Sequence, residues 1–149
     1  MIMLSTPGLI GSAYFCHTRQ QLGAVTPSRI EQIGSTHDPV RITRVSPRRV
    51  ELETEGKFAS TFEDLPFRRP SHGFEAGESY ELAVGTLRVL EVQAEGRPTK
   101  LDLTLNQPPD AFDFAVWTER GFERFTLPPE GEYVDLPATS TFLMGEDAN

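Results

Sequence analysis

Residues 33–92 read IGSTHDPVRITRVSPRRVELETEGKFASTFEDLPFRRPSHGFEAGESYELAVGTLRVLEV. Short runs in this stretch alternate polar and apolar side chains, as in RVELET, where Val50 and Leu52 fall on one face. Turn-forming residues interrupt the runs, for example Pro47 and Gly56. Because successive side chains of a β-strand point to opposite faces, and because proline cannot donate to a strand ladder, the stretch predicts a meander of antiparallel strands.

The rest of the chain repeats this pattern. Residues 1–16 read as one or two strands, and residues 17–29 as a polar loop in which a helix would lack an apolar stripe. Residues 99–105 alternate cleanly, with the leucines on one face. Short strands separated by turns at roughly 8–12-residue intervals are typical of sandwiches and barrels. We predict an all-β fold without a convincing helix: an antiparallel β-sandwich of about ten to twelve short strands.

Two further runs are less regular. Residues 57–62 form another candidate strand. Near the end of the opening stretch, Leu87 and Val89 share one face, whereas Leu90 and Val92 fall on the other. Either both faces of that strand are covered or a β-bulge shifts its register.

The size and composition of the chain favour one folded domain. The 149 residues are 38% hydrophobic and include ten Phe, which is sufficient for a single core. We expect this domain to span residues 1–140 and a flexible acidic tail to follow at 141–149. No apolar run approaches the ~18 residues that a membrane-spanning helix requires, and no basic residue precedes the first apolar stretch, as a secretory signal would need.

The chain has a single cysteine, Cys16, which excludes an intrachain disulfide. A protein without disulfides is compatible with a reducing compartment. We therefore expect a cytoplasmic location.

The charge of the chain is unevenly distributed. The net charge is -8, which disfavours broad binding to nucleic acids or to anionic membranes. Half of the 14 basic residues nevertheless lie in one short span: Arg41, Arg44, Arg48, Arg49, Lys57, Arg68 and Arg69. A local basic surface on an acidic protein suits a specific anionic partner. The alternative is that these side chains are solvated strand faces and loop rims.

Four segments within residues 33–92 resemble the motifs of forkhead-associated (FHA) domains. Gly34-Ser35 stands at the place of the family's Gly-Arg, and the SPRR run at 46–49 at that of Ser-x-x-His. Ser71-His72-Gly73 stands for Asn-Gly, and the GESYEL run at 77–82 for the closing Gly-Asp run. The family is a β-sandwich that binds phosphothreonine peptides through its loops. The motif Arg, His and Asn are replaced here, so the resemblance implies an adaptor with altered or lost phosphopeptide binding.

The basic loops supply the candidate ligand-binding residues. An anionic group is held by several donors that converge on one pocket, ideally arginine forks with a hydroxyl. The residues with this chemistry are Arg44, Ser46, Arg48, Arg49, Arg68, Arg69 and Ser71. They form one site if the two loops meet at the same end of the sandwich.

The aromatic residues near the C-terminus suggest a second surface. Phe112, Phe114 and Phe125 flank Trp117 and Phe122 in two runs separated by a glycine turn. Core packing is the default interpretation. Exposed Trp117 and Phe122 would instead form a protein-docking anchor or a platform for a sugar.

Catalytic and metal-binding patterns are weak. The residues His17, His37 and His72 have no metal-ligand spacing with one another or with Cys16. We expect no enzyme activity, no cofactor and no metal.

Three hypotheses for the function remain. The first is a non-enzymatic adaptor that binds another protein through a phosphorylated or acidic segment. The second is a structural subunit of a multiprotein assembly that docks through the aromatic hairpin or an open strand edge. The third is a small carbohydrate-binding or hydrolytic β-domain. The identity of the partner and the oligomeric state do not follow from the sequence.

Overall fold

The alternating run within residues 40–54 forms a β-hairpin near the middle of the larger of two sheets. In this computed structural model, which describes residues 1–6, 15–17, 19–24, 26–59 and 73–139, β3 (Val40–Ser46) pairs antiparallel with β4 (Arg49–Thr54). Pro47 lies in the turn between them, where its missing N–H does not remove a hydrogen bond from the sheet.

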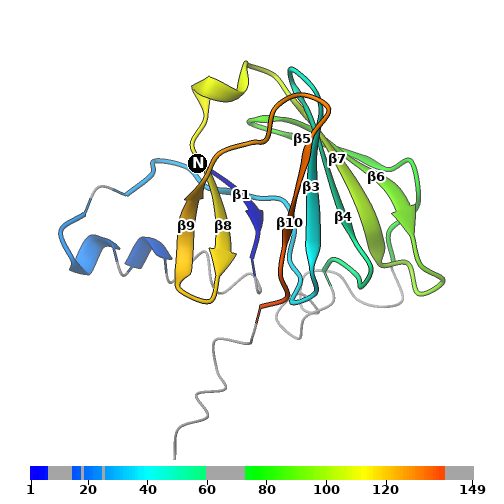
Figure 1. Cartoon of the computed structure of the whole chain (residues 1–149), viewed down its shortest axis with the longest axis horizontal. Helices are drawn as coiled ribbons and strands as arrows, with labels where there is room; N and C mark the ends of the chain where they lie inside the picture. Colours follow the sequence, from blue (N-terminus) through cyan, green and yellow to red (C-terminus); the bar gives the residue numbers. More distant parts are fainter. Residues whose placement is uncertain (7–14, 18, 25, 60–72, 140–149) are drawn as a thin grey trace, which may run out of the picture.

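The larger sheet has six strands in the order β10-β3-β4-β7-β6-β5, and every neighbouring pair is antiparallel (Figure 1). The other four strands have the following bounds: β5 (Ser79–Leu82), β6 (Gly85–Val92), β7 (Pro98–Leu105) and β10 (Tyr133–Leu136). The register between β6 and β7 shifts between Val89 and Glu91. This bulge, rather than two covered faces, accounts for the change of apolar face along β6.

The smaller sheet has four strands in the order β2-β1-β8-β9. Their bounds are β1 (Ile2–Ser5), β2 (Glu31–Gln32), β8 (Phe114–Thr118) and β9 (Gly121–Phe125). β8 and β9 form an antiparallel hairpin, whereas β1 lies parallel to both of its neighbours. Strands from the two ends of the chain are therefore side by side in this sheet.

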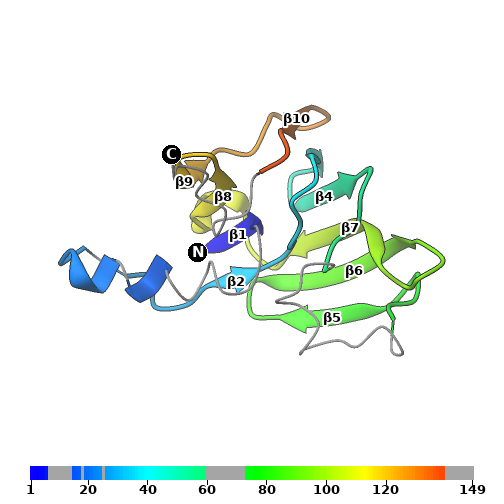
Figure 2. The ribbon, with the colours of Figure 1, turned by 90° about the horizontal axis from the view of Figure 1, so that it is seen from below.

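The core lies between the two sheets (Figure 2). The smaller sheet contributes Ile2 and Leu4 from β1 and Phe114 and Val116 from β8. The larger sheet contributes alternate residues of its central strands: Val40, Ile42, Val50, Leu52, Val89, Leu101, Leu103 and Leu105. The predicted all-β sandwich is thus confirmed, and the part of the chain that the structure describes contains ten strands, within the predicted range.

The structure also departs from the predicted elements. Residues 15–17 and 19–21 are helical, although a strand was expected to reach residue 16, and η2 (Pro109–Ala111) is a short 3₁₀ helix between β7 and β8. The Phe15 ring packs against Phe122 of β9. This tertiary contact supports the helical residues, and the local sequence pattern does not indicate it. Residues 57–59 are not a strand; Phe58 is buried in the core from a loop.

Some predicted features lie outside the described residues: the end of the candidate strand at 57–62, the loop residues up to 72, and the acidic tail at 141–149. Among the described residues, the helices are too short and too polar to span a bilayer.

Replacing Gly85 with alanine tests the tight turn between β5 and β6. Gly85 has φ +147°, and an added Cβ would collide with the Thr104 carbonyl oxygen and lie 2.9 Å from Leu105 Cα. Gly77 also has a positive φ, +94°, but a Cβ there meets no atom within 4 Å. Both variants add backbone strain. We expect Gly85→Ala to lose ~1–3 kcal/mol more unfolding free energy than Gly77→Ala, because only Gly85→Ala also overpacks.

Urea denaturation followed by circular dichroism measures this difference. Equal losses of stability in the two variants would show that β6 and β7 do not approach as closely as described.

Candidate functional site

Arg49, a member of the predicted basic surface, lies on the outer face of the six-stranded sheet. Its Nε donates to Asp102 Oδ1 at 2.7 Å, and its Nη2 donates to Glu51 Oε1 at 2.9 Å. Only 9% of the Asp102 side chain is exposed. Arg49 is therefore already paired with two carboxylates of β4 and β7, and an incoming anion would have to displace them.

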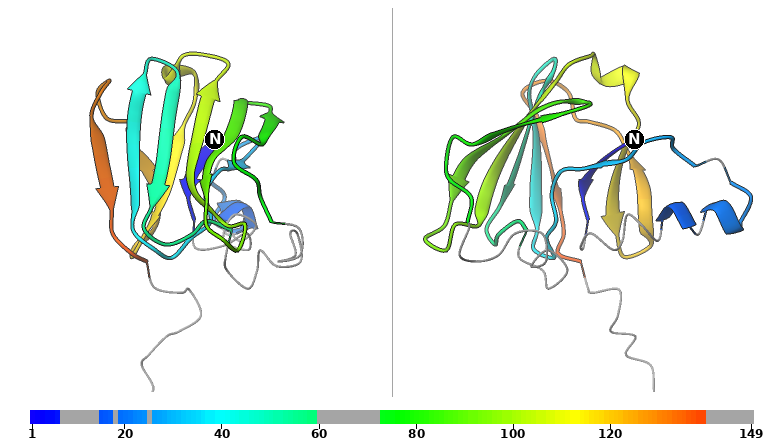
Figure 3. Two further views of the ribbon diagram at one scale, coloured as in Figure 1. Left: turned by 90° about the vertical axis from the view of Figure 1, so that its right-hand side faces the viewer. Right: turned by 180° about the vertical axis from the view of Figure 1, so that it is seen from behind.

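Arg41 is paired in the same way on the same face, toward which the left view of Figure 3 looks. Its Nε and Nη2 donate to the two carboxylate oxygens of Asp135 on β10, at 2.7 and 3.1 Å. Lys100 on β7 lies 3.4 Å from both Glu51 and Glu53. Basic and acidic side chains thus alternate across adjacent strands. Arg41 and Arg49 therefore match the alternative interpretation, in which these side chains lie on a solvated strand face and pair with carboxylates of the same sheet.

Arg44 and Arg48 lie at one end of the sandwich instead. Arg44 is in register with Val50 and so projects toward the inner side of the sheet, near the end of β3. Its Nη2 donates to the Pro47 carbonyl at a long 3.4 Å, and its Nε is buried without a hydrogen-bond partner among the described residues. Arg48 is exposed in the β3–β4 turn. The structure brings these two arginines together and places Arg49 apart from them.

A cavity of about 500 Å³ separates the β3–β4 turn from the connection between β7 and β8. We call it the tip pocket, and its lining residues are Arg44, Pro47, Arg48, Pro108, Pro109 and Asp110. Across the described ranges, no ion pair forms to Arg44 or Arg48. Asp110, an exposed residue of η2, is the one acidic residue among the described lining residues. The tip pocket therefore has a local excess of positive charge.

The remaining predicted ligands do not line this pocket or cannot be placed. Ser46 is half-buried at the end of β3, where the register with β4 shifts. Arg68, Arg69 and Ser71 fall in the part of the chain that the structure does not describe.

Trp117 and Phe122 face each other across the β8–β9 hairpin on the outer side of the smaller sheet. Their rings form a T-shaped contact with centroids 4.8 Å apart. The Phe15 ring packs on Phe122 in the same manner, at 5.1 Å. The Arg19 guanidinium lies 5.3 Å from the centroid of the Phe15 ring. The predicted docking residues thus contact one another, and the N-terminal helical residues cover part of their surface.

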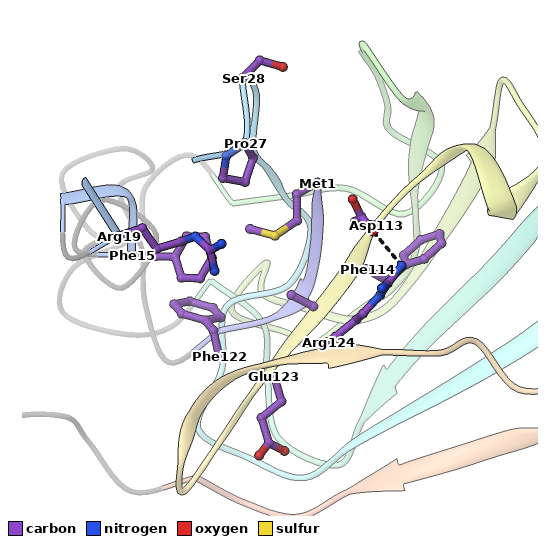
Figure 4. Close-up of a pocket in the computed structure, with 11 residues that line it drawn as sticks. Met1, Phe15, Arg19, Pro27, Ser28, Asp113, Phe114, Phe122, Glu123 and Arg124 are labelled. Carbon is purple, nitrogen blue, oxygen red and sulfur yellow. Dashed lines mark hydrogen bonds and ion pairs between the residues drawn. The ribbon is translucent and has the colours of Figure 1, made fainter. Parts of the chain in front are cut away.

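A second cavity, of about 450 Å³, lies between these helical residues and the smaller sheet (Figure 4). We call it the aromatic pocket, and its main lining residues are Met1, Phe15, Arg19, Asp113, Phe122 and Arg124. Sequence reasoning identified Phe122 as a candidate binding residue and missed the others. No local signal marks them, because they come from three separate segments that only the folded chain brings together.

Comparison with known proteins returns no match to a family model, a curated protein or a solved structure. The resemblance to FHA domains therefore stays a prediction. Among the residues that the structure describes, no group of three or more His, Cys, Asp or Glu side chains is arranged to hold a metal ion.

Removing the carboxylate of Asp102 tests the paired outer face. We expect Asp102→Ala to lower the unfolding free energy by about 1.5–3 kcal/mol, because a buried, charge-assisted hydrogen bond to Arg49 is lost. Asp135→Ala is the matched control, since its carboxylate also pairs with one arginine but is 56% exposed. The control should lose clearly less, as measured by chemical denaturation at pH 7. Similar losses of unfolding free energy in the two variants would contradict the greater burial of the Asp102 carboxylate.

The Arg41–Asp135 pair predicts a small pH dependence. The hydrogen bond from Arg41 holds the pKa of Asp135 below its usual value of 3.8. A carboxylate with a lowered pKa in the folded state contributes stability above its unfolded pKa, and this contribution is lost as the pH falls through the lower folded pKa. The melting temperature of the wild type should therefore exceed that of Asp135→Asn at pH 6, and the difference should vanish in stronger acid. A difference that grows on acidification would exclude the pair as its cause.

Proposed function

We propose that this protein is a non-enzymatic interaction module that binds an acidic segment of a partner protein at the tip pocket. The observation that carries this proposal is that Arg44 and Arg48 line one cavity, while Arg41 and Arg49 of the same basic run are paired with carboxylates. Arginines that have no acidic partner among the described residues are available to one from outside.

The donors of the tip pocket suit an oxyanion. A guanidinium presents a planar fork of N–H groups that matches a carboxylate or a phosphate. Among the described residues, the Arg44 side chain makes one long hydrogen bond, to the Pro47 carbonyl, and its buried Nε has no partner. An unsatisfied buried donor is unfavourable by about 1–3 kcal/mol, so a ligand that reorients this guanidinium gains from satisfying it.

The rest of the lining favours binding over covalent chemistry. Three prolines, Pro47, Pro108 and Pro109, give the pocket apolar walls with a restricted backbone. Among the described residues, the lining contains no Ser, Cys or His that would act as a nucleophile or a base. An extended peptide with an acidic or phosphorylated side chain would meet both the arginines and these walls. This supports the adaptor hypothesis over the hydrolytic one.

Binding of labelled peptides tests the proposal. Fluorescence anisotropy would compare a short polyglutamate peptide, the same peptide with a central phosphothreonine, and a polylysine peptide. We expect the two anionic peptides to bind and the polylysine peptide not to bind. Arg44→Gln and Arg48→Gln should each weaken binding about tenfold, because a charge-assisted hydrogen bond is worth ~1.5–3 kcal/mol. Asp110→Asn should strengthen it, because a like charge is removed from the pocket.

Arg120→Gln serves as the matched control. Arg120 is an exposed arginine in the β8–β9 turn, at the opposite end of the sandwich, and it pairs with Glu123 at 2.8 Å (Figure 1). This variant should bind as the wild type does. The proposal is overturned if the Arg44→Gln/Arg48→Gln double variant, with an unchanged circular dichroism spectrum, binds the anionic peptides normally, or if neither anionic peptide binds the wild type.

A further inference from the structure

The larger sheet ends at β10, and no other described strand lies beyond it (orange strand in the left view of Figure 3). The edge strands of the smaller sheet are less open, because β2 has only two residues and β9 is contacted by Phe15 through Phe122. Leu22 and Tyr133 are the exposed large hydrophobic residues in the described part of the chain, and of these two only Tyr133 belongs to a strand. β10 is therefore an edge strand with an exposed aromatic side chain.

Alternate backbone groups of β10 have no partner among the described residues. Arg44 N–H donates to the Glu132 carbonyl at 3.1 Å, which fixes the alternation of the ladder between β3 and β10. Hydrogen-bonded and non-hydrogen-bonded positions alternate in an antiparallel pair, so Val134 is the next residue of β10 that bonds to β3. Tyr133 and Asp135 occupy the other positions, and their backbone N–H and C=O groups point away from the sheet. Such a row of groups is a template to which an extended segment adds as a further strand.

The side chains beside this edge differ between its two faces. On the outer face, Tyr133 is 55% exposed, and the Arg41 guanidinium lies 4.2 Å from the centroid of its ring. On the inner face, Val134 is half-buried and Leu136 packs against the core. An added strand places its own side chains alternately on these two faces. The residue opposite Val134 would be apolar, because it would extend the cover of the core at this edge.

The charge of the edge favours a basic segment. Residues 126–139, which contain β10, include Glu130, Glu132 and Asp135 and no basic residue. Asp135 pairs with Arg41 of β3, whereas neither glutamate forms an ion pair within the described residues. Opposite charges on neighbouring strands stabilise a sheet, and like charges destabilise it. A second copy of the same acidic edge is disfavoured for this reason.

We propose that the β10 edge binds an extended segment of a partner protein in which basic residues alternate with apolar ones. The segment adds antiparallel to β10, as do all neighbouring strands of this sheet. Its basic residues lie opposite Tyr133 and Asp135 on the outer face, and an apolar residue packs beside Val134. The ligand proposed for the tip pocket has the opposite charge, so this inference does not rest on that function.

Amide hydrogen exchange of the ¹⁵N-labelled full chain tests the edge directly. In the free protein, the Tyr133 and Asp135 amides should exchange at least tenfold faster than the Val134 amide, because only Val134 is protected by a hydrogen bond to β3. Addition of the peptide KVKVKVK should slow the exchange of the Tyr133 and Asp135 amides at least fivefold.

Matched peptides separate charge from strand formation. EVEVEVE keeps the alternation with the opposite charge, and heptalysine keeps the charge without the apolar face. We expect both to bind at least tenfold more weakly than KVKVKVK in a chemical-shift titration. Backbone N-methylation of the lysines removes the N–H groups that face β10 and should weaken binding at least tenfold. N-methylation of the valines, whose N–H groups face away from β10, should change the affinity less than threefold.

Two variants of Asp135 form a matched pair. Asp135→Pro and Asp135→Asn both lose the ion pair with Arg41, but only proline also removes the outward N–H, a change that edge strands tolerate. Asp135→Pro should weaken KVKVKVK at least tenfold, and Asp135→Asn about threefold or less, because an exposed pair contributes little. The Glu130→Gln/Glu132→Gln double variant should weaken the peptide about two- to fivefold, and Arg120→Gln should bind it unchanged.

Four results would each overturn the proposal: no binding of KVKVKVK at millimolar concentration, equal binding of EVEVEVE, equal effects of the two N-methylations, or slow exchange of Tyr133 and Asp135 in the free protein. If that exchange slows as the protein concentration rises, a second copy occupies the edge, and the proposal is overturned as well. The N-methylated peptides keep the test decisive even if Asp135→Pro does not fold. Loss of basic-peptide binding and loss of acidic-peptide binding at the tip pocket are separate outcomes.

Discussion

Burial of apolar side chains between the two sheets is the interaction on which the structure depends. The larger sheet presents Leu52, Leu101 and Leu103 to the interior, and the smaller sheet covers them with residues such as Ile2 and Phe114. In β3, β4 and β7 this burial takes alternate residues, because the side-chain period of a strand is two. Every residue between two core positions is thereby placed on an outer face.

That placement determines which charged residues are available for recognition. Arg41, Arg49 and Lys100 alternate with core residues, so they lie on the outer face opposite acidic residues of neighbouring strands. Cross-strand pairs of opposite charge stabilise such a face modestly and neutralise it. Arg44 and Arg48 escape this pairing because Arg44 takes an inner-facing position near the end of β3 and Arg48 lies in the β3–β4 turn. The binding that we propose at the strand ends would then follow from the same pattern that builds the core.

How much of this could be read from the sequence depends on the range of the contacts involved. The alternation around Val50 and Leu52 correctly predicted β3, β4 and their antiparallel pairing, since the signal and the structure are both local. The bulge in β6 was one of two alternatives, and only the register with β7 decides between them. The parallel pairing of β1 was not predictable, because nothing near Ile2 indicates that Phe114 will be its neighbour.

The candidate sites show the same limit. Arg44 and Arg48 were identified by composition, but their separation from Arg49 follows from which face each side chain takes. Phe122 was identified as an exposed aromatic candidate, whereas its neighbours Phe15 and Arg19 come from a polar segment without a periodic pattern. When two segments far apart in the chain contact each other, the sequence of neither segment indicates that contact.

The position of β1 also affects how the protein is made. β1 is synthesised well before its partner β8, because most of the described strands lie between them in the chain. Non-local pairings of this kind slow folding, because loop closure must precede the contacts that stabilise it. The apolar Ile2-Met3-Leu4 run, wholly buried in the finished fold, therefore lacks its β8 partner in the nascent chain until residues 114–118 are made. A holding chaperone would find an exposed apolar segment there.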